Sequence, residues 1–280
     1  MDSIIAGNRI DDLAADGLRG FGAREIFRDN IVQNCVTIDG NHPDGFQSFS
    51  GATVTGLILK RNFFLEWANA PSHRLRCGMQ GIGLFDGLFE NLTITNNVVA
   101  VRNGHGITVM GARNARLIND TVVNIGGLQP GYPWIAVYPS KTGVPSTDVI
   151  VANNLAMAFG GANDKANRIQ FINNRVVRSV NHAYPAWQSF DYAIRPDGRF
   201  IDAADPLYAP ALDVLRHPRP IGPGPDIGAY EMSALGLPPA LTDEVLQPPP
   251  PVTVEADAAE AAAGGTTSKT ATGAKLLKAP

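Results

Sequence analysis

An asparagine-like residue opens the same short phrase seven times along this chain, each time followed by two mostly apolar or β-branched residues. The phrases begin at Asn8, Asn30, Asn62, Asn97, Asp120, Asn154 and Asn174. Successive intervals are 22, 32, 35, 23, 34 and 20 residues. Repeats of this length are typical of a solenoid, in which each unit buries its apolar face against its neighbours. An Asn at one corner of every coil can pass amide hydrogen bonds from coil to coil, and it tolerates the left-handed backbone of a sharp corner.

The residues before each ladder position alternate between apolar and polar, as in 54–59, 92–95, 149–152 and 169–172. This period of two is the pattern of a β-strand, and these runs are too short for helices. Gly, Asn and Asp separate the runs, as turns require. The leucine-rich-repeat consensus is missing. The sequence therefore predicts an all-β right-handed parallel β-helix of about six or seven coils.

A second column of residues supports the same register. Phrases such as Asp16-Gly17-Leu18 and His105-Gly106-Ile107 lie upstream of the ladder residues. Their alignment predicts one inward-facing apolar stack of Leu18, Phe46, Ile82, Ile107 and Ile135. The uneven intervals then become loops at 65–79, 125–133 and 139–147, and loops on a rigid scaffold are where clefts are usually built.

Three regions follow from the pattern. Residues 1–180 carry the coils. Residues 181–233 are irregular, aromatic and Pro-rich, and we expect them to cap the open C-terminal end, because uncovered strand edges promote aggregation. The composition changes sharply at residues 234–280, which include Pro248–Pro251. We interpret this region as a linker and a flexible tail.

Composition narrows the function classes. The 280 residues are 44% hydrophobic with a formal charge of −3, and Lys and Arg are scattered, so nucleic acid is not an expected partner. No run is long enough for a membrane span, and the start Met1–Ile5 lacks the features of a signal peptide. We expect an extracellular protein, at a cell surface or on a virus-like particle. Cys35 and Cys77 are expected to be buried free thiols, with a disulfide as the alternative.

The ladder and the phrase stack over about residues 3–180 resemble the pectin-lyase-like superfamily of right-handed β-helices. Arg219-Pro220 followed by Pro225–Glu231 is similar to the "R-P … D-I-G-A-Y-E" ending of many bacterial secreted or surface β-helix proteins. Some of those proteins are polysaccharide lyases. We interpret this ending as structural, with Asp226 and Glu231 tying down the last coil and Tyr230 plugging it.

Within the superfamily, polygalacturonases carry "N-T-D", "D-D", "G-H-G" and "R-I-K" on successive coils. The chain has Asn41–Gly45, Gly104–Gly106 and Arg168–Gln170 in the same order. Where the aspartate pair should stand, it has Met79-Gln80. Glycoside hydrolysis needs two carboxyl groups. The resemblance therefore implies the fold but not polygalacturonase activity.

Asp16 and Asp44 are predicted to stack on adjacent coils, about 4.8 Å apart. Two carboxylates that close cannot both ionise cheaply, so one pKa should rise, or a cation such as Ca²⁺ should bind between them. A metal there would suit a lyase, in which it neutralises a uronate carboxylate while a base removes the neighbouring proton. The alternative is that both carboxylates only cap corner amides.

The best catalytic candidates form one polar cluster of Asp44, His105, His42 and Gln47. The glycines on either side of His105 leave its ring free to be exposed, although a satisfied corner histidine is the alternative. Arg74 and Arg76, on the 65–79 loop, are candidates to pair with an acidic sugar. Their alternative is a solvated loop face.

A line of large apolar residues is predicted to point outward at one place on successive coils: Phe21, Phe49, Phe85, Met110 and Tyr138. Such patches usually mark contacts. Sugar rings could stack on Phe49, Phe85 and Tyr138, another subunit of a homotrimer could cover the stripe, or the loops and 181–233 could fold over it.

Three functional hypotheses remain. The first is a polysaccharide-recognising β-helix, with a lyase acting on an acidic glycan favoured over a hydrolase. The second is a non-catalytic glycan-binding or receptor-binding spike of a cell surface or phage-like particle. The third is a structural surface protein without a ligand.

Overall fold

The computed structural model describes residues 2–38, 40–49, 51–69, 73–126, 131–196 and 198–232. They all belong to the first of two compact units, Met1–Pro248. The linker and tail predicted over 234–280 lie outside these described residues. In the described part of the chain, no helix is long and apolar enough to cross a membrane.

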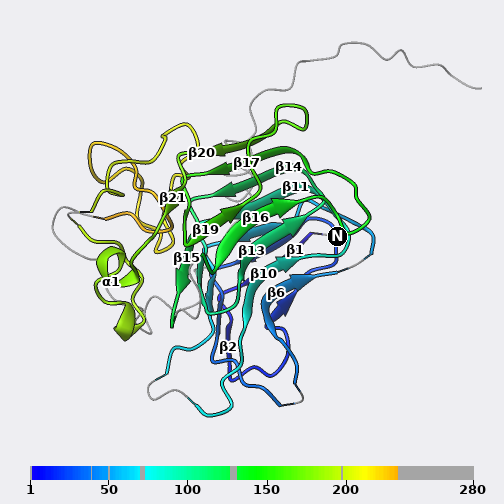
Figure 1. Cartoon of the computed structure of the whole chain (residues 1–280), viewed down its shortest axis with the longest axis horizontal. Helices are drawn as coiled ribbons and strands as arrows, with labels where there is room; N and C mark the ends of the chain where they lie inside the picture. Colours follow the sequence, from blue (N-terminus) through cyan, green and yellow to red (C-terminus); the bar gives the residue numbers. More distant parts are fainter. Residues whose placement is uncertain are drawn as a thin grey trace, which may run out of the picture. The chain divides into compact units, whose positions relative to one another are not determined.

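The chain folds into a right-handed parallel β-helix with three sheets, as the ladder predicts (Figure 1). The eight-stranded sheet contains β1 (Ser3–Ala6), β4 (Glu25–Arg28), β7 (Thr53–Thr55), β8 (Ile58–Lys60), β11 (Leu88–Thr95), β14 (Ala112–Ile118), β17 (Thr147–Ala152) and β20 (Ile169–Ile172). The seven-stranded sheet contains β2 (Arg9–Asp11), β5 (Ile31–Gln33), β9 (Phe63–Leu65), β12 (Val98–Val101), β15 (Thr121–Asn124), β18 (Leu155–Ala156) and β21 (Arg175–Val176). The six-stranded sheet contains β3 (Leu18–Arg19), β6 (Asp44–Ser48), β10 (Gln80–Leu84), β13 (His105–Met110), β16 (Trp134–Tyr138) and β19 (Ala158–Gly160).

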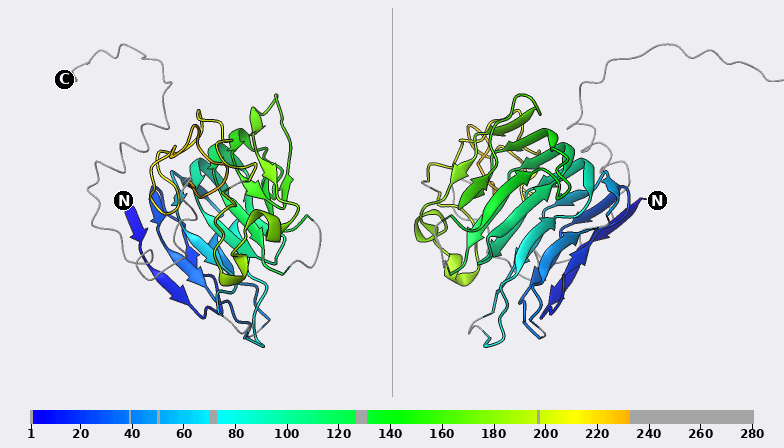
Figure 2. Two further views of the ribbon diagram at one scale, coloured as in Figure 1. Left: turned by 90° about the vertical axis from the view of Figure 1, so that its left-hand side faces the viewer. Right: turned by 45° about the vertical axis from the view of Figure 1, so that its right-hand side comes forward.

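Successive coils stack in sequence order, from the blue N-terminal strands to the green ones in Figure 2. Each of the first six coils supplies all three sheets, and a seventh supplies β20 and β21. The predicted apolar stack is confirmed. Leu18 pairs with Phe46, Phe46 with Ile82, Ile82 with Ile107, and Ile107 with Ile135. All five side chains are buried in the core enclosed by the three sheets.

The asparagine ladder runs through the corner between the eight-stranded and seven-stranded sheets. Asn30 Nδ2 donates to Asn62 Oδ1, and Asn62 Nδ2 donates to Asn97 Oδ1, each over 2.9 Å. Each Nδ2 also donates to a main-chain carbonyl of the neighbouring coil, such as Phe27 O for Asn62. We expected the ladder residue itself to adopt the left-handed conformation. In the structure, the residue before it does so. Positive φ occurs at Gly7, Asp29, Arg61, Asn96, Asn119, Asn153 and Asn173.

Residues 180–196 and 198–232 run along the outer face of the seven-stranded sheet and include α1 (Val180–Ala183) and the short 3-10 helix η1 (Trp187–Ser189). Their buried Tyr184, Tyr192 and Ile227 form one apolar cluster with Val98 and Leu155 of that sheet. The sequence predicts this segment at the open C-terminal end, whereas these contacts run along the flank of the coils.

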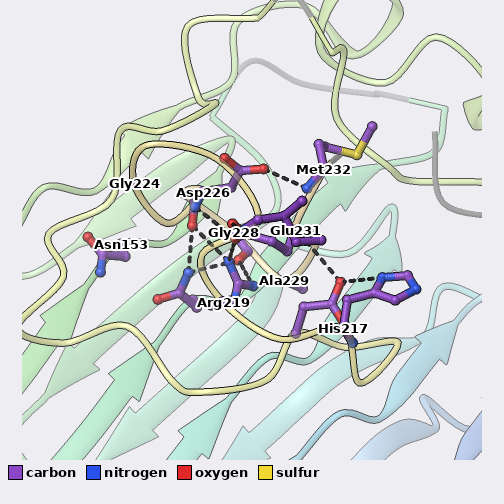
Figure 3. Close-up of polar contacts among 12 residues, drawn as sticks. Asn153, His217, Arg219, Gly224, Asp226, Gly228, Ala229, Glu231 and Met232 are labelled. Atoms are coloured by element: carbon purple, nitrogen blue, oxygen red, sulfur yellow. Dashed lines mark hydrogen bonds and ion pairs between the residues drawn. The ribbon is translucent and has the colours of Figure 1, made fainter. Parts of the chain in front are cut away.

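The D-I-G-A-Y-E ending fastens this segment to the corner asparagines (Figure 3). Asn119 Nδ2 donates to the carbonyls of Asp226 and Gly228, each over 2.9 Å. Gly228 N donates to Asn153 O over 2.9 Å. The carboxylates act inside the ending, since Glu231 Oε2 accepts from the Asp226 amide over 2.9 Å. The ending is therefore structural in these contacts, and it joins successive coils from the side.

The two cysteines form a disulfide, so the expectation of two free thiols is wrong. Cys35 and Cys77 have Cα atoms 5.4 Å apart, and their residues lie on neighbouring coils. Cys77 N also donates to Cys35 O over 3.0 Å. The bond fixes the connection between the seven-stranded and six-stranded sheets in these two coils.

Candidate functional site

The candidate site is the outer face of the six-stranded sheet. Glycines in the recurring phrases decide which residues point there. A Cβ on Gly45 would lie 2.6 Å from Phe64 in the core, and a Cβ on Gly81 would lie 2.3 Å from Val99. These positions therefore face inward and must be glycine. The preceding residues form an outer column, in which Asp44 pairs with Gln80 and His105 pairs with Trp134.

Asp44 is completely buried in this face, although it belongs to the outer column. A Cβ on Gly83 would lie 3.1 Å from Asp44 Oδ1 and 2.4 Å from the Phe85 ring. Because Gly83 has no side chain, the Phe85 ring and the Asp44 carboxyl can both pack against its backbone. Neither carboxyl oxygen of Asp44 has a hydrogen-bond partner among the described residues.

The pKa of Asp44 is raised to about 8, first by burial and then by the charge of Asp16, while Arg19 acts weakly in the opposite direction. Asp16 stands beside it, since Asp16 Oδ1 accepts from the Asp44 amide over 2.9 Å. Asp16 Oδ2 accepts from Arg19 Nε over 2.8 Å. Of the two outcomes expected for this pair, the geometry favours the raised pKa. Asp44 is then a neutral carboxylic acid at pH 7.

A calcium ion fits this pair poorly. Calcium binds six to eight oxygen atoms. Both Asp16 oxygens already accept hydrogen bonds. The remaining oxygen atoms are the two of Asp44 and Gln80 Oε1, which are buried acceptors without a hydrogen-bond partner among the described residues. Asp44 and Gln80 are paired across neighbouring strands. Among the residues that the structure describes, no group of three or more His, Cys, Asp or Glu side chains is placed to hold a metal. A proton on Asp44 gives this group of acceptors a donor.

His105 lies half-buried two strands away from Asp44, which corresponds to about 10 Å across a sheet. Its Nδ1 lies 3.0 Å from Thr108 Oγ1, and Trp134 Nε1 donates to the same oxygen over 3.0 Å. Burial lowers the pKa of His105, so the ring is neutral at pH 7. The ring also contacts Phe85 and Trp134 edge to face, at centroid distances of 5.1 Å and 5.0 Å.

The outward stripe lies where the sequence places it. Phe21 and Phe49 are 45% and 40% exposed, with ring centroids 5.0 Å apart. Phe85, Met110 and Tyr138 are half-buried. The segment 180–232 covers a different sheet, so this part of the chain does not fold over the stripe. The exposed rings are therefore accessible on this face.

Two cations stand over the stripe. The Arg19 guanidinium lies 5.4 Å from the centre of the Phe49 ring, and Lys141 Nζ lies 5.9 Å from the centre of the Phe85 ring. Each is also paired with an acid, Arg19 with Asp16 and Lys141 with Asp86, both over 2.8 Å. The face therefore combines flat rings with polar groups at its rim.

The other predicted site residues are more scattered. Gln47 shares the face, since it pairs with Gly83, whereas His42 is exposed in the irregular segment before β6. Arg74 is exposed on its loop. Arg76 Nε donates to Glu66 Oε1 over 2.9 Å, and its guanidinium lies 6.0 Å from the Trp67 ring centre. Arg76 is thus held beside the end of the seven-stranded sheet.

The motif order shared with polygalacturonases does not converge in space. Asp44, Gln80 and His105 lie on successive strands of the six-stranded sheet. Arg168 instead precedes β20 of the eight-stranded sheet, where its Nη2 donates to Asp148 Oδ2 over 2.6 Å. The last element of that motif therefore lies on a different sheet from the other elements.

Two residues of the face were not among the sequence candidates. Trp134 completes the His105 column, and Tyr132 packs on it with a centroid distance of 4.9 Å. The sequence missed this pairing. Alignment of Ile135 with Ile107 sets Pro133 opposite His105, and a register shift between His105 and Ile107 is what brings Trp134 there. Comparison of the chain with protein-family models, with curated proteins and with solved structures yields no match.

Proposed function

We propose that this protein binds a polysaccharide along the outer face of the six-stranded sheet. The observation that carries the proposal is the row of Phe21, Phe49 and Phe85 on successive coils, in which the Phe21 and Phe49 rings are exposed and have centroids 5.0 Å apart. Apolar faces of sugar rings pack on aromatic rings, and exposed apolar patches on a protein usually mark a contact. The resemblance to the pectin-lyase-like superfamily supports the same ligand class.

Polar groups at the rim supply the directional contacts that such a ligand needs. Arg19 and Lys141 stand over two of the rings, and their side chains are 49% and 56% exposed. Gln47 lies between the Asp44 column and the stripe. A chain of sugars lying across the strands would meet a ring and a polar side chain on successive coils. The exposed sides of both cations favour a glycan with carboxylate groups.

Turnover by a lyase is the second candidate, and the state of two residues favours it. Neutral His105 can act as a base, and neutral Asp44 can act as an acid. In a β-elimination, the base removes the proton from the carbon next to the carboxylate. The electron pair of that C–H bond forms the C=C bond, and the glycosidic oxygen leaves with a proton from the acid. Asp44 lies beneath Phe85, so this role requires the ring to move aside. Binding without turnover requires no such movement.

A non-catalytic spike remains the alternative context for the same binding face. The disulfide supports an extracellular location, because such bonds persist in oxidising compartments. A homotrimer would be expected if other copies cover part of the stripe. Analytical ultracentrifugation of the full chain separates the monomer from the trimer.

The test is a panel of acidic and neutral polysaccharides, with retention measured by affinity electrophoresis and elimination by ultraviolet absorbance of unsaturated products. We expect the parent to retain an acidic glycan and Phe21→Ala/Phe49→Ala to lose at least tenfold in affinity. Leu207→Ala, which removes a 78% exposed apolar side chain from another surface, is the matched control. If the double variant binds like the parent, the proposed face is wrong. Absorbance that rises with the parent but not with His105→Ala assigns turnover.

A further inference from the structure

A second concave site lies at the ends of β9 and β15, on another wall of the solenoid. Trp67, Arg76 and Ile125 line it from the coils, and Trp187, Phe190 and Tyr192 line it from the segment around η1. Its volume is about 220 Å³. Small-molecule sites usually measure about 300–1,000 Å³, so this cleft suits a ligand of a single ring.

The ionic group around Glu66, beside the cleft, carries a net positive charge. Glu66 is completely buried and accepts from Arg76 Nε over 2.9 Å and from Arg102 Nε over 2.5 Å. Arg102 is further held by the Cys77 carbonyl, 2.8 Å from its Nη2. One carboxylate therefore faces two guanidinium groups, which leaves a net charge of +1 in this group. Arg76 is the member that lines the cleft.

Three lining residues carry a buried polar atom that has no hydrogen-bond partner within the described ranges. They are Trp67 Nε1, Arg76 Nη2 and Tyr192 Oη. Each of the three can donate a hydrogen bond, and an indole or guanidinium nitrogen can only donate. Buried donors are almost always satisfied, and leaving one unsatisfied is costly. Three such donors around one cleft indicate a ligand rich in acceptors.

We propose that this cleft binds a carboxylate carried on a single six-membered ring, as in a uronic acid. The carboxylate would pair with the Arg76 guanidinium, which lines the cleft. Trp67 Nε1 and Tyr192 Oη are covered in the structure and would donate to the ligand after the side chains over them shift. The apolar face of the ring would lie against Trp187 and Phe190. This site is separate from the stripe and goes beyond the polysaccharide-binding face, since either can fail without the other.

The test uses the full chain and isothermal titration with glucuronate, with glucose, acetate and benzoate as comparison ligands. Glucuronate should bind at least tenfold more tightly than glucose, because glucose lacks the carboxylate. Acetate tests the need for a ring, and benzoate distinguishes an aromatic acid from an acidic sugar. Binding of glucuronate should weaken as the salt concentration rises.

Arg76→Gln should weaken glucuronate binding at least tenfold, since hydrogen bonds to charged groups are the strong ones. Arg178→Gln, at an exposed arginine outside the cleft, is the matched control. Trp187→Leu leaves the Glu66 group intact and should also weaken binding, which keeps the test valid if Arg76→Gln unfolds. Equal binding of glucose and glucuronate, unchanged binding in both variants, or no glucuronate binding by the parent overturns the proposal. Loss of polysaccharide retention in Phe21→Ala/Phe49→Ala with normal glucuronate titration separates the two sites.

Discussion

The backbone amide of Asp44 donates to the Asp16 carboxylate over 2.9 Å, which fixes a negative charge beside a second, completely buried carboxyl group. The pKa of Asp44 rises to about 8 as a result of burial and of Asp16. In the unfolded chain the same carboxyl titrates near its ordinary value of 3.8. The folded state therefore holds a proton that the unfolded state releases at neutral pH.

Asp44→Asn should remove this pH dependence. A group with a raised folded pKa contributes stability that is present below its unfolded pKa and is lost as the pH rises through its folded pKa. The parent should lose about 1.4 kcal/mol of unfolding free energy per pH unit, relative to the variant, between roughly pH 4 and 8. Urea unfolding at a series of pH values measures this. Parallel pH profiles for parent and variant would show that Asp44 is ionised in the folded protein.

Asp120 is the one ladder position in the seven where a carboxyl replaces the amide. Its Oδ1 accepts from Asn97 N and Nδ2 over 2.8 Å and 2.9 Å, but its buried Oδ2 has no partner among the described residues. At other positions the equivalent Nδ2 donates twice, as Asn154 does to Leu117 O and Asn174 Oδ1. A proton on Oδ2 restores one donor, and burial raises the pKa of Asp120 to about 7.

Asp120→Asn should therefore stabilise the protein above pH 7, where the parent must bury a charge or lose the ladder contact. The raised pKa means that the parent's stability falls as the pH rises from about 4 towards 7, again by about 1.4 kcal/mol per unit. Thermal unfolding at pH 5 and pH 9 should show little difference at the lower pH and a higher Tm for the variant at the upper. Asp120→Ala is the control and should be less stable at both. A variant Asp120→Asn that melts earlier at pH 9 contradicts the neutral ladder carboxyl.

Glycine in the recurring phrase has a steric role that a single pair of substitutions can test. A Cβ at Gly81 would lie 2.1 Å from Gly106 O and 2.3 Å from Val99 Cγ1. Gly81→Ala should cost about 1–3 kcal/mol, at the upper end of that range because the neighbouring backbone cannot yield. Gly78→Ala is the matched control, since nothing lies within 4 Å of a Cβ there. Denaturant midpoints for both variants decide the point, and equal midpoints would mean that the strand can shift freely.

The coil register was predictable from sequence because a ladder residue must occupy the same corner in every coil. One fixed corner per coil, together with strands of period two, places Leu18, Phe46 and Ile82 in one stack without further information. The left-handed position was misplaced by one residue. Doublets such as Asn96-Asn97 and Asn153-Asn154 contain the reason, since the first residue takes the strained conformation and the second makes the ladder bonds.

The position of residues 180–232 was not predictable from their own sequence, which has no period. The strand that they cover did hold a signal. Val98-Val99-Ala100-Val101 is apolar on both faces, and such runs are typical of strands buried on both sides. The burial of Asp44 was harder to foresee. It depends on the Phe85 ring and the Asp44 carboxyl both packing at Gly83. Asp44 and Phe85 lie on different coils, so no local pattern records this arrangement.

The attachment of the C-terminal segment depends on Arg219, whose guanidinium is buried between four acceptors. Its Nη1 donates to Glu231 Oε2 over 2.9 Å and to Asp226 O over 3.0 Å, and its Nη2 donates to Gly228 O and Asn96 Oδ1. The Glu231 carboxylate receives further bonds from the amides of Asp226 and Ile221. Removing the guanidinium therefore leaves a buried charge and several unsatisfied groups.

Arg219→Met should destabilise the protein by about 3–5 kcal/mol, as is usual when one partner of a buried ion pair is removed. Because Lys cannot reproduce the planar set of donors, Arg219→Lys should recover little of this loss. Hydrogen exchange should locate the effect, with faster exchange at Gly228 N and Ala229 N, which donate to Asn153 and Thr121 of the coils. Arg113→Gln breaks the exposed 3.4 Å pair with Glu90 and should change stability by less than about 1 kcal/mol. If Arg219→Met behaves like this control, the segment is held by its apolar cluster alone.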